Sequence, residues 1–503
     1  MRRFALRIGK RFNSSSAGSS SGLGARQFGP HLDYRGLKAR IVSGEMGLNV
    51  SQRNLDLDVG AAAFLYDAKV ALGFELDALR KQRNDVAAKV KATSKENKQD
   101  IQGLVKRGRE IKESLATLEA KAAKLDADLY NTARHLPNDT CPSVPVGDES
   151  NAITLATINA SLLNKEYKSP PQTHVDLCLL HDTADFNRAS KVSGSGFYFL
   201  KNHGAMLEHA LQRYAIETLT LYHGFTPISV PDVIRHEVLE ACGFSPRSTD
   251  SQTYFLSTQL DASTDSFASV DPTRLCLAAT AEFPLAAMHA GEVLSPKDLP
   301  KKYVGLGRAF RAEGLAGSIN RGLYRVHQFS KVEMFALVAG GGSDNSTSAL
   351  MLEEFRSIQH NLFEGLELCF RVLNMPTEEL GAPAYKKYDM EAWMPGKNAW
   401  GEISSASNCT DYQSRRLNIR NLRPSSSSSN NTETGTQNLE FVHTVNGTAA
   451  AIPRLIIALL ETHQQPNGDI YIPKKLQPFL YGGKVEVIKA DETFQELIAR
   501  IRN

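Results

Sequence analysis

The most regular hydrophobic pattern in the chain lies between residues 60 and 135, where apolar residues recur at steps of three and four without an intervening proline. That spacing places them along one side of an α-helix. A polar break at residues 93–100 (TSKENKQD) divides the pattern into two seams. We therefore predict an antiparallel coiled-coil hairpin of two helices of about five turns each. The seam residues are Leu72, Leu76, Leu79, Arg83, Val86 and Val90 in the first helix and Ile101, Leu104, Gly108, Ile111, Leu115, Leu118, Ala122, Leu125 and Leu129 in the second.

A different pattern follows Pro137. After a proline-rich linker and a polar stretch to about residue 170, short strand-like runs alternate with helical segments, as in an α+β domain. Residues 204–235 predict an amphipathic helix that leads into a strand ending at Pro231. Two stretches, 257–273 and 424–438, have the low hydrophobicity of flexible surface loops.

Residues 304–338 predict two strands around a short loop, but they carry four arginines, two glutamates and a histidine. The strand period of two places Arg311 and Glu313 on one face of the first strand. By the same rule, one face of the second strand carries Arg325, His327, Phe329, Lys331 and Glu333. Such a concentration of charge on a sheet face needs a partner, so this stretch predicts a binding surface.

Composition adds a local contrast in charge. The chain has 503 residues, enough for two or three domains, and its net charge of +3 indicates no particular partner. Residues 80–124, however, contain 13 Lys or Arg against 6 Asp or Glu. A basic hairpin suits a phosphate backbone, although a solvated coiled-coil face used for dimerisation has the same composition. No apolar run approaches the roughly 20 residues of a membrane helix, so we expect a soluble protein without membrane insertion.

The N-terminal residues 1–28 are rich in arginine and serine, and no acidic residue precedes Asp33. Phe4, Leu6 and Ile8 can lie along one side of a basic helix, which is typical of an organelle transit peptide. We predict import into the mitochondrial matrix; a disordered basic tail is the alternative. The six cysteines are scattered, without a CxxC pair or a nearby histidine at metal spacing. We therefore expect neither a zinc site nor a disulfide framework.

Five segments of the chain resemble the seryl-tRNA synthetases, a branch of the class II aminoacyl-tRNA synthetases. The segment FRAE…RGLYRVHQFSKVE resembles motif 2, and NGTAAAIPRLIIALLE resembles motif 3. TAE at 280–282 and EISSASNCTDYQSRRLNIR at 402–420 resemble signatures of the seryl branch, and KVSGSGFYFLKNHGAMLEHAL resembles the start of its catalytic domain. The resemblance implies an antiparallel, seven-stranded type of catalytic sheet preceded by a coiled-coil arm, in a homodimer.

The resemblance also implies a division into domains. Residues 29–150 would form an N-terminal tRNA-binding domain that includes the arm, and residues 165–485 the catalytic domain. Residues 486–503 would be a C-terminal extension. The loop between the motif 2 strands, residues 314–320, is short and lacks the charged residues often found in the family.

Activation of an amino acid by ATP requires a cationic clamp on a triphosphate rather than a protein nucleophile. The resemblance implies that Arg311 contacts the α-phosphate, Glu313 contacts adenine and Arg454 holds the distal phosphates, with the two arginines as the catalytic residues. It implies Mg²⁺ held with ATP by Glu402 and Ser405. The implied ATP-binding residues are Arg311, Ala312, Glu313, Val326, Glu402, Ile403, Ser404, Ser405 and Arg454.

Serine has a cationic amine and a polar hydroxyl, so a selective pocket should offer carboxylates and hydroxyls. The resemblance implies a serine site formed by Thr280, Ala281, Glu282, Arg311, Glu333, Asn446 and Thr448. Without the resemblance, Thr280 is interpreted as a helix N-cap with Glu282 in the first turn of the helix. Glu333 is then interpreted as a strand-surface partner of Lys331 or Arg325. His327 is interpreted as a structural residue behind the pocket.

The sequence thus predicts a serine–tRNA ligase that forms seryl-adenylate from L-serine and ATP and then charges tRNA(Ser) for mitochondrial translation. Two alternatives stay open. One is a catalytically inactive, synthetase-like protein that only binds RNA or a partner. The other is a class II synthetase for a different amino acid, such as threonine or proline, and the missing zinc ligands disfavour threonine.

Overall fold

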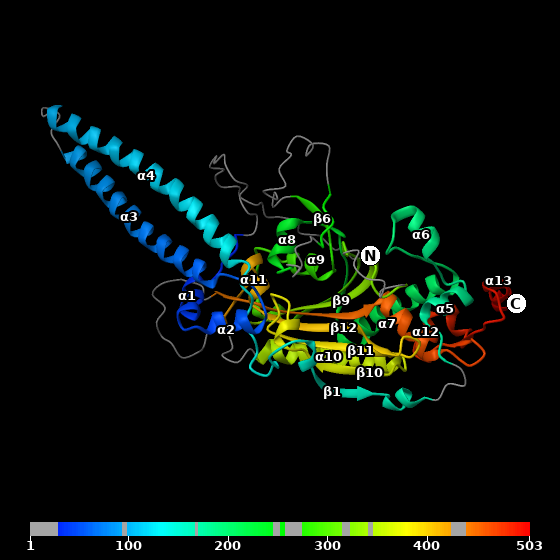
Figure 1. Ribbon diagram of the computed structural model, residues 1–503. Helices are drawn as coiled ribbons and strands as arrows, with labels where there is room; N and C mark the ends of the chain where they lie inside the picture. Colours follow the sequence, from blue (N-terminus) through cyan, green and yellow to red (C-terminus); the bar gives the residue numbers. More distant parts are fainter. Residues whose placement is uncertain are drawn as a thin grey trace, which may run out of the picture.

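The computed structural model describes most of the chain as a helical arm attached to a mixed α/β body (Figure 1). The described residues are 29–92, 98–165, 170–244, 252–256, 274–313, 322–340, 346–423 and 439–502. Four stretches discussed above lie outside them, namely the predicted transit segment 1–28, the two predicted insertions 257–273 and 424–438, and the motif 2 loop at 314–321.

The arm consists of α3 (Val59–Ala92) and α4 (Lys98–Ala133), which confirms the predicted antiparallel hairpin. The predicted length of about five turns was too short, because the helices have 34 and 36 residues and α4 is therefore about 54 Å long. Both helices continue without a proline, and Gly108 of α4 lies opposite Val86 of α3. The buried centre of the seam is formed by Leu72, Leu76, Ile111 and Leu115.

The base of the arm is fixed to the body through a buried arginine. The short helices α1 (Tyr34–Val42) and α2 (Glu45–Gln52) pack at this base. Arg53, which follows α2, is fully buried and donates hydrogen bonds to the carbonyl oxygens of four residues, Asn138, Asp139, Gly381 and Ala384. Because a buried guanidinium is stable only when its donors are satisfied, these bonds hold the arm on the body.

The body is built around one large sheet, which confirms the predicted class II synthetase fold. Among the described residues the sheet has eight strands rather than the seven expected, because β1 adds to one edge. Neighbours are antiparallel except β4 and β8, which are parallel. In spatial order the strands are β1 (Ile153–Ile158), β10 (Phe370–Asn374), β11 (Lys386–Met394), β12 (Ala399–Thr410), β15 (His443–Ala451), β9 (Gln328–Val338), β8 (Lys301–Phe310) and β4 (Thr226–Ser229).

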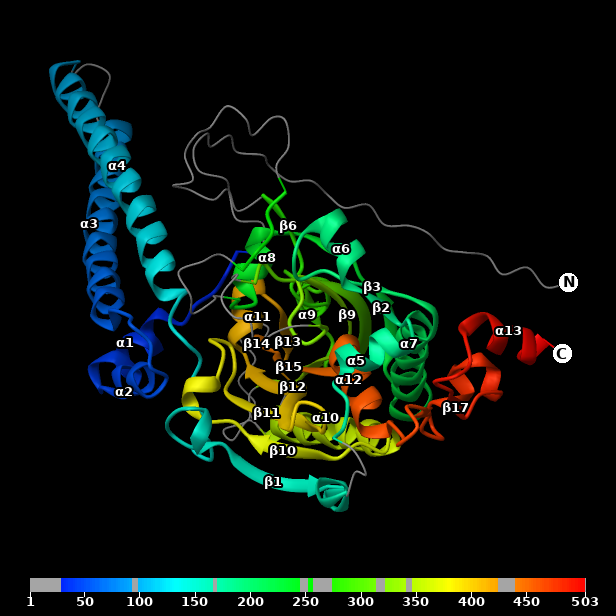
Figure 2. The ribbon, with the colours of Figure 1, turned by 45° about the vertical axis from the view of Figure 1, so that its right-hand side comes forward.

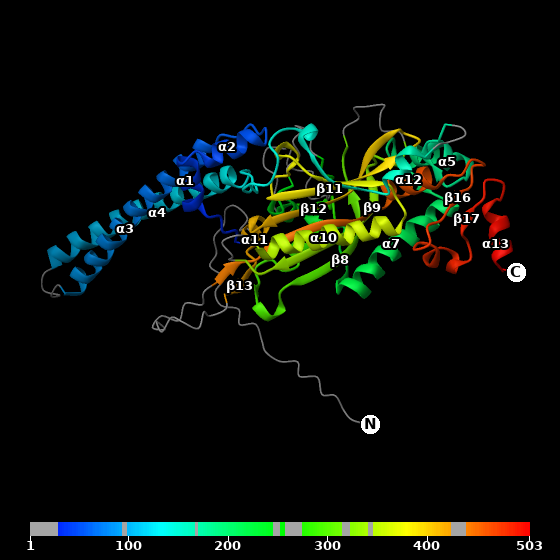
Figure 3. The ribbon, with the colours of Figure 1, turned by 90° about the horizontal axis from the view of Figure 1, so that it is seen from below.

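Three helices cover one face of this sheet: α7 (Asn202–His223), α10 (Ser346–Gly365) and α12 (Ile452–His463). Figure 3 shows α10 lying over the sheet, in roughly the direction of the strands. Alternate residues of each strand enter this core, so that Val332 and Met334 of β9 are fully buried beneath the helices. The side chains of the residues between them point to the opposite face of the sheet, where the charged side chains lie.

The opposite face is covered at its arm-proximal end by α8 (His236–Ala241), α9 (Glu282–Ala287) and α11 (Tyr412–Leu417), which form a second core with the sheet. The chain ends in α13 (Phe494–Arg502), on the side of the body away from the arm (Figure 2). The remaining helices and strands are α5 (His174–Leu180), β2 (Ala184–Asp185), α6 (Phe186–Ser193), β3 (Phe199–Leu200), β5 (Val233–Arg235), β6 (Leu275–Leu277), β7 (Val293–Leu294), β13 (Arg420–Leu422), β14 (Leu439–Phe441), β16 (Ile470–Tyr471) and β17 (Val487–Ile488).

Two further observations concern the chain as a whole. All six cysteines are free thiols, and five of them are buried. In the described part of the chain, no helix combines the length and the apolar character needed to cross a membrane.

Candidate active site

The charged hairpin at residues 304–338 has shorter strands than its sequence predicts. β8 ends at Phe310 and β9 begins at Gln328. The prediction that its charged residues share strand faces is therefore wrong for Arg311, Glu313, Arg325 and His327, which lie beyond the strand ends. Lys331 and Glu333 do lie on one face of β9, the face opposite the helix-covered core.

The chain leaves the sheet ladder just after Arg311. The Arg311 N–H still donates to the carbonyl oxygen of His327 at 2.9 Å, and the Ala312 N–H, on the other edge of the segment, donates to the carbonyl of Gln252 at 3.0 Å. The Arg311 guanidinium lies 5.4 Å from the ring centroid of Phe329.

Arg311 is an electrostatically unfavourable side chain in the protein alone. Burial, together with the nearby Arg454 guanidinium, lowers the pKa of Arg311. Its buried Nε has no hydrogen-bond partner among the described residues, whereas most buried side-chain polar atoms have one. Two neighbouring cations repel each other, and an anion between them removes that repulsion. The arrangement therefore suits a negatively charged ligand.

Arg454 is held near the start of α12 by three groups. Its Nη1 lies 3.0 Å from both the carbonyl oxygen and Oε2 of Glu402, and its Nε donates to the carbonyl of Tyr324 at 3.4 Å. The guanidinium also lies 4.8 Å from the centroid of the Tyr324 ring. Burial alone would raise the pKa of Glu402, but Arg454, with Lys387 and Arg311, outweighs it and lowers that pKa to about 2.

A small cavity with an accessible volume of about 20 Å³ lies between these side chains. Its walls are formed by Arg311, Glu313, Leu323, Tyr324, Arg325, Val326, Phe329, Pro453 and Arg454. Glu313 is paired with Arg325, whose Nη1 lies 3.3 Å from its Oε2. The structure thus brings together four of the residues assigned to ATP from the sequence, with Glu402 beside them.

The side chains of Ile403 and Ser404 point away from this cavity. Met390 of β11 pairs with Ser404 and Glu391 pairs with Glu402, so Ile403 is an extra, unpaired residue in β12. This bulge turns both side chains toward the core face. Ile403 is fully buried there, and the Ser404 hydroxyl donates to the carbonyl of Thr448 at 2.6 Å. Only the backbone atoms of these two residues are therefore available to a ligand in the cavity. The alternation of side chains along a regular strand does not predict this arrangement.

A second group of polar side chains, the carboxylate pocket, surrounds Glu333, which is only 2% exposed. Its Oε1 accepts hydrogen bonds from the hydroxyls of Thr280 at 2.8 Å and Thr448 at 3.4 Å and forms an ion pair with Lys331. The Thr280 hydroxyl also accepts from the Glu282 N–H at 3.3 Å, at the start of α9. The Lys331-partner interpretation of Glu333 therefore describes a real contact, whereas the interpretation of Thr280 as a helix N-cap is wrong, because the N-cap of α9 is Ala281.

Glu282 is the second carboxylate of this pocket. Its Oε1 accepts from Gln413 Nε2 at 2.6 Å and from Asn446 Nδ2 at 3.0 Å. Burial is the main reason that the pKa of Glu282 rises to about 7; Glu333 raises it further, while the Gln413 hydrogen bond opposes the shift. Ala281, only 2% exposed, lies between Thr280 and Glu282 in the chain. All the residues assigned to serine other than Arg311 are therefore close neighbours.

Two family models match the chain. One describes the "Seryl-tRNA synthetase N-terminal domain" and matches residues 47–140, which include the arm. The other describes the "tRNA synthetase class II core domain (G, H, P, S and T)" and matches residues 267–463, which include both groups of side chains.

Full-length relatives decide between the branches of that class. The "Serine--tRNA ligase" of Treponema denticola is 40% identical over 451 residues, covering 89% of this chain and 98% of the relative. The chain belongs to the seryl-tRNA synthetase family. The mitochondrial "Serine--tRNA ligase" of Bos taurus is 44% identical over 382 residues, covering 75% of this chain and 68% of the relative. The predicted class of enzyme, a serine–tRNA ligase, is confirmed.

The fold of this synthetase also matches solved structures. The seryl-tRNA synthetase of Pyrococcus horikoshii, determined in complex with ATP, has a TM-score of 0.74 and 33% identity, covering 91% of this chain and 97% of that one. The match includes the arm and the sheet together, which confirms the predicted order of an N-terminal helical hairpin and a class II catalytic sheet.

The oxygen ligands near Arg454 fit the magnesium ion that the family implies for the synthetase. Glu402 and Ser405 lie next to Asp389 of β11, which pairs in register with Ser405. Asp389 is 5% exposed; Lys387 Nζ lies 2.7 Å from its Oδ2, while its buried Oδ1 has no hydrogen-bond partner. Mg²⁺ prefers oxygen ligands of this kind and keeps several waters. Within the described ranges, no group of three or more His, Cys, Asp or Glu residues is arranged to hold a metal ion.

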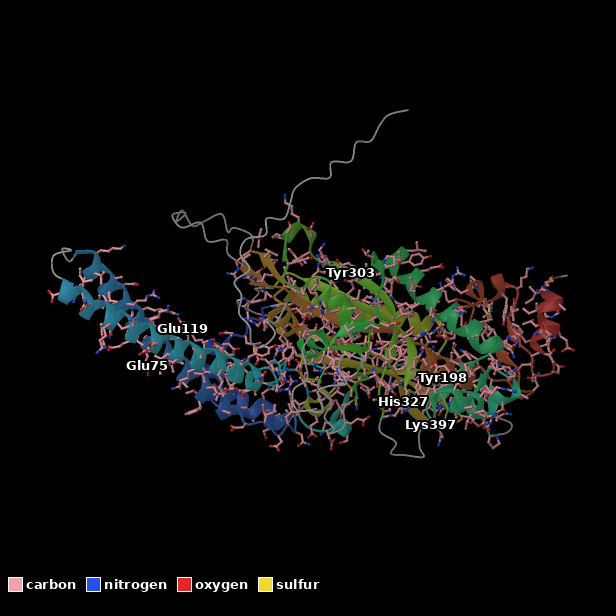
Figure 4. The ribbon with its side chains drawn as sticks, turned by 90° about the horizontal axis from the view of Figure 1, so that it is seen from above. Glu75, Glu119, Tyr198, Tyr303, His327 and Lys397 are labelled. Carbon is pink, nitrogen blue, oxygen red and sulfur yellow. The ribbon has the colours of Figure 1, made fainter. Side chains whose placement is uncertain are left out.

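His327 supports the Arg311 segment of the synthetase. Its Nδ1 lies 3.0 Å from the carbonyl oxygen of Arg311 and 2.8 Å from the Tyr254 hydroxyl, and its ring stacks on Phe197. Gly196, with φ of +81°, allows this approach because a Cβ there would lie 2.4 Å from the imidazole. Figure 4 shows His327 in the body, far from Glu75 and Glu119 on the arm. These contacts agree with the predicted structural role.

Three contributors to the site were not found from the sequence. They are Tyr324, which lies beneath Arg454, Gln413, which bonds Glu282, and Asp389, which faces Ser405. Tyr324 and Gln413 lie inside the motif segments RGLYRVHQ and TDYQSRR, and their positions in these motifs could have identified them as site residues. Asp389 had no such signal, because its importance depends on the register of β11 and β12.

Proposed function

We propose that this synthetase activates L-serine with ATP and transfers it to tRNA(Ser) for translation in mitochondria. The observation that carries the proposal is the position of Arg311 between an arginine–glutamate pair and a carboxylate pocket. Both Glu402 and Glu333 lie close enough to influence its pKa. A triphosphate bound near Arg454 and an amino acid bound near Glu333 would therefore meet at Arg311.

ATP is assigned to the cavity between Arg311 and Arg454. Arg311 would contact the α-phosphate and Arg454 the distal phosphates, while Glu313 would contact adenine at the other end of the cavity. Magnesium held by Glu402 and Ser405 would neutralise phosphate charge. The unpartnered Nε of Arg311 supports this assignment, because phosphate oxygens satisfy such a donor.

Serine is assigned to the carboxylate pocket. The two carboxylates of the pocket differ in whether a neighbouring cation compensates their negative charge. Glu333 is paired with Lys331 and bonded by two hydroxyls. Glu282 accepts hydrogen bonds from two neutral amides, and no ion pair is found for it among the described residues. The substrate ammonium would therefore bind Glu282, and the hydroxyl would bind Glu333 and Thr448. An amino acid without the hydroxyl would leave those buried groups unpaired.

The reaction needs positioning rather than a protein nucleophile. In the first step, a carboxylate oxygen of serine attacks the α-phosphorus of ATP, the bond to the β-phosphate oxygen breaks, and pyrophosphate leaves. In the second step, the terminal ribose hydroxyl of the tRNA attacks the acyl carbon, and AMP leaves. Arg311 would stabilise the charge that develops on the α-phosphate oxygens in the first step.

The arm is proposed as the tRNA-binding element, because it concentrates a local charge of +7 on residues 80–124. It extends away from the body that contains the site (Figures 1 and 4). A tRNA bound along the arm would thus place its acceptor end in the site of a second subunit. Homodimer formation is supported by the apolar side chains of Leu221 and Tyr222 at the end of α7, which are 69% and 78% exposed beside the edge strand β4.

Mitochondrial import is proposed from the basic, serine-rich residues 1–28 and from the similarity to the mitochondrial bovine relative. A fluorescent fusion of the full chain should enter mitochondria, and the same fusion without residues 1–28 should not. Retention of the shortened fusion in mitochondria would contradict the assignment of the transit segment.

The serine assignment is tested by Glu333→Ala. Removal of the carboxylate leaves the Thr280 and Thr448 hydroxyls and Lys331 without their partner, and serine-dependent exchange of pyrophosphate into ATP should fall by about 10³-fold or more. Glu354→Ala is the matched control, since Glu354 pairs with Lys302 away from the pocket. Near-normal activity of the Glu333 variant would contradict the assignment of serine to this pocket.

The pH dependence of serine binding follows from the raised pKa of Glu282, about 7. An ammonium ion binds the ionised carboxylate, so below pH 7 a proton must first be lost from the site. We expect kcat/KM for serine to fall by about tenfold per pH unit below pH 7 and to level off above it. In Glu282→Gln the inflection near pH 7 should disappear along with most of the affinity for serine. An unchanged inflection in that variant would assign the titration to another group.

A further inference from the structure

Gln413 on α11 is a fully buried glutamine whose amide is bonded at both ends. Its Nε2 donates to Glu282 Oε1 at 2.6 Å and lies 3.4 Å from the carbonyl oxygen of Cys242. Its Oε1 accepts from the hydroxyl of Thr444 at 2.7 Å. Thr444 lies on β15 and is itself fully buried. Cys242 is also buried, and Glu282 is the partly exposed member of this set of bonds.

The neighbours define the orientation of the amide. A carboxylate only accepts hydrogen bonds when ionised, so the NH₂ end of Gln413 faces Glu282. The Thr444 hydroxyl donates to the other end and holds the amide oxygen there. If the amide were turned over, its oxygen would face the carboxylate and lose this favourable bond.

The Gln413 bond affects which oxygen of Glu282 is free. Gln413 and Asn446 both donate to Oε1, so Oε2 is the oxygen left to face a ligand. The titratable groups facing Glu282 from other elements are Glu333 and Lys331 on β9, together with Cys242 after α8 and Cys409 on β12. Burial raises the pKa of both thiols, which keeps them neutral. Lys331 is already paired with Glu333.

We propose that Gln413, oriented by Thr444, is a positioning residue that favours the ionised form of Glu282 and directs Oε2 at the ammonium group of the amino acid substrate. This inference rests on the proposed assignment of Glu282 to serine. A hydrogen bond to a charged acceptor is stronger than one between neutral groups, so Gln413 favours the ionised form over the protonated form. Gln413 therefore acts on the recognition of the amino acid and not on ATP.

The test uses Gln413→Met, which conserves length and volume and removes the amide. Serine and ATP kinetics are measured by pyrophosphate exchange between pH 6 and 8.5. At pH 7 the KM for serine should rise by about tenfold or more, while kcat and the KM for ATP stay near their wild-type values. The increase should shrink toward pH 8.5, because high pH ionises Glu282 without help from Gln413.

Two variants of Thr444 test the orientation of the amide separately. Thr444→Val removes the hydroxyl, leaves the amide in place, and should raise the KM for serine in the same direction by a smaller factor. Thr444→Ser keeps the hydroxyl and should restore the wild-type value. If Gln413→Met fails to fold, these two variants of Thr444 test the proposal in its place.

Gln464→Met is the control for the loss of a buried amide. Gln464 is 6% exposed and forms three hydrogen bonds, to Gln172 and Glu461, outside the carboxylate pocket. It should lower the melting temperature without changing the KM for serine. The inference is overturned if Gln413→Met and the wild type have the same pH profile of the serine KM. A wild-type protein without serine-dependent exchange would contradict the proposed function and this inference together.

Discussion

Arg311→Met is expected to reduce serine-dependent pyrophosphate exchange by about 10³-fold while leaving the protein at least as stable as the wild type. Arg311 is a half-buried cation beside Arg454, its pKa is lowered by burial and by that neighbour, and its Nε has no partner. The side chain therefore opposes folding in the protein alone. Functional sites commonly contain residues that lower the stability of the fold and are needed for activity.

The measurement combines exchange kinetics with thermal unfolding. Arg356→Met is a matched control, because Arg356 on α10 pairs with Glu353 at 2.7 Å on the helix-covered side of the sheet. That variant should keep both its activity and its KM for ATP. If Arg311→Met retained activity within a few-fold of the wild type, the assignment of Arg311 to the α-phosphate would be wrong.

Replacing residues 75–125 of the arm with a short Gly-Ser linker should separate the two steps of the reaction. The Lys69–Asp126 ion pair at 2.8 Å remains and closes the shortened hairpin. Adenylate formation should stay close to wild type, because the arm extends away from the site (Figure 1). Charging of tRNA(Ser) should fall by about 10²-fold or more, since most of the basic residues that would contact the RNA backbone are removed.

Light scattering on the same variant resolves the alternative that the arm is a dimerisation surface. A dimer that survives removal of the arm assigns subunit contact to the body and the basic charge to RNA. Equal loss of adenylate formation and charging would show that the arm is needed for folding, and conversion to a monomer would show that the arm holds the subunits together.

The helical arm followed directly from the sequence, because it depends on local spacing, whereas the charged residues of the site were identified through the resemblance to the family. Leu72, Leu76, Ile111 and Leu115 recur at helical steps, and they form the buried seam. The positions of the side chains along the catalytic strands were harder to predict. The segment that follows β8 is held by a bond between Ala312 and Gln252, which lie 60 residues apart in sequence.

The side-chain directions and contacts that the sequence did not predict share a physical cause. Ile403 and Ser404 turn toward the core because one extra residue in β12 interrupts the alternation. Gln413 reaches Glu282 across 131 positions of sequence, and Asp389 faces Ser405 only through the register of two strands. These contacts are set by tertiary packing, which spacing within a segment does not reveal.

The most direct test of the account is pyrophosphate exchange into ATP by the purified protein, measured with each amino acid in turn. We expect exchange with L-serine and little with alanine or proline, because serine supplies both an ammonium group for Glu282 and a hydroxyl for Glu333 and Thr448. Threonine supplies the same groups, and we expect less exchange with it because its extra methyl group has to enter a pocket whose Glu333 and Thr448 are buried. Exchange driven by a different amino acid, or none with serine while ATP still binds, would contradict it.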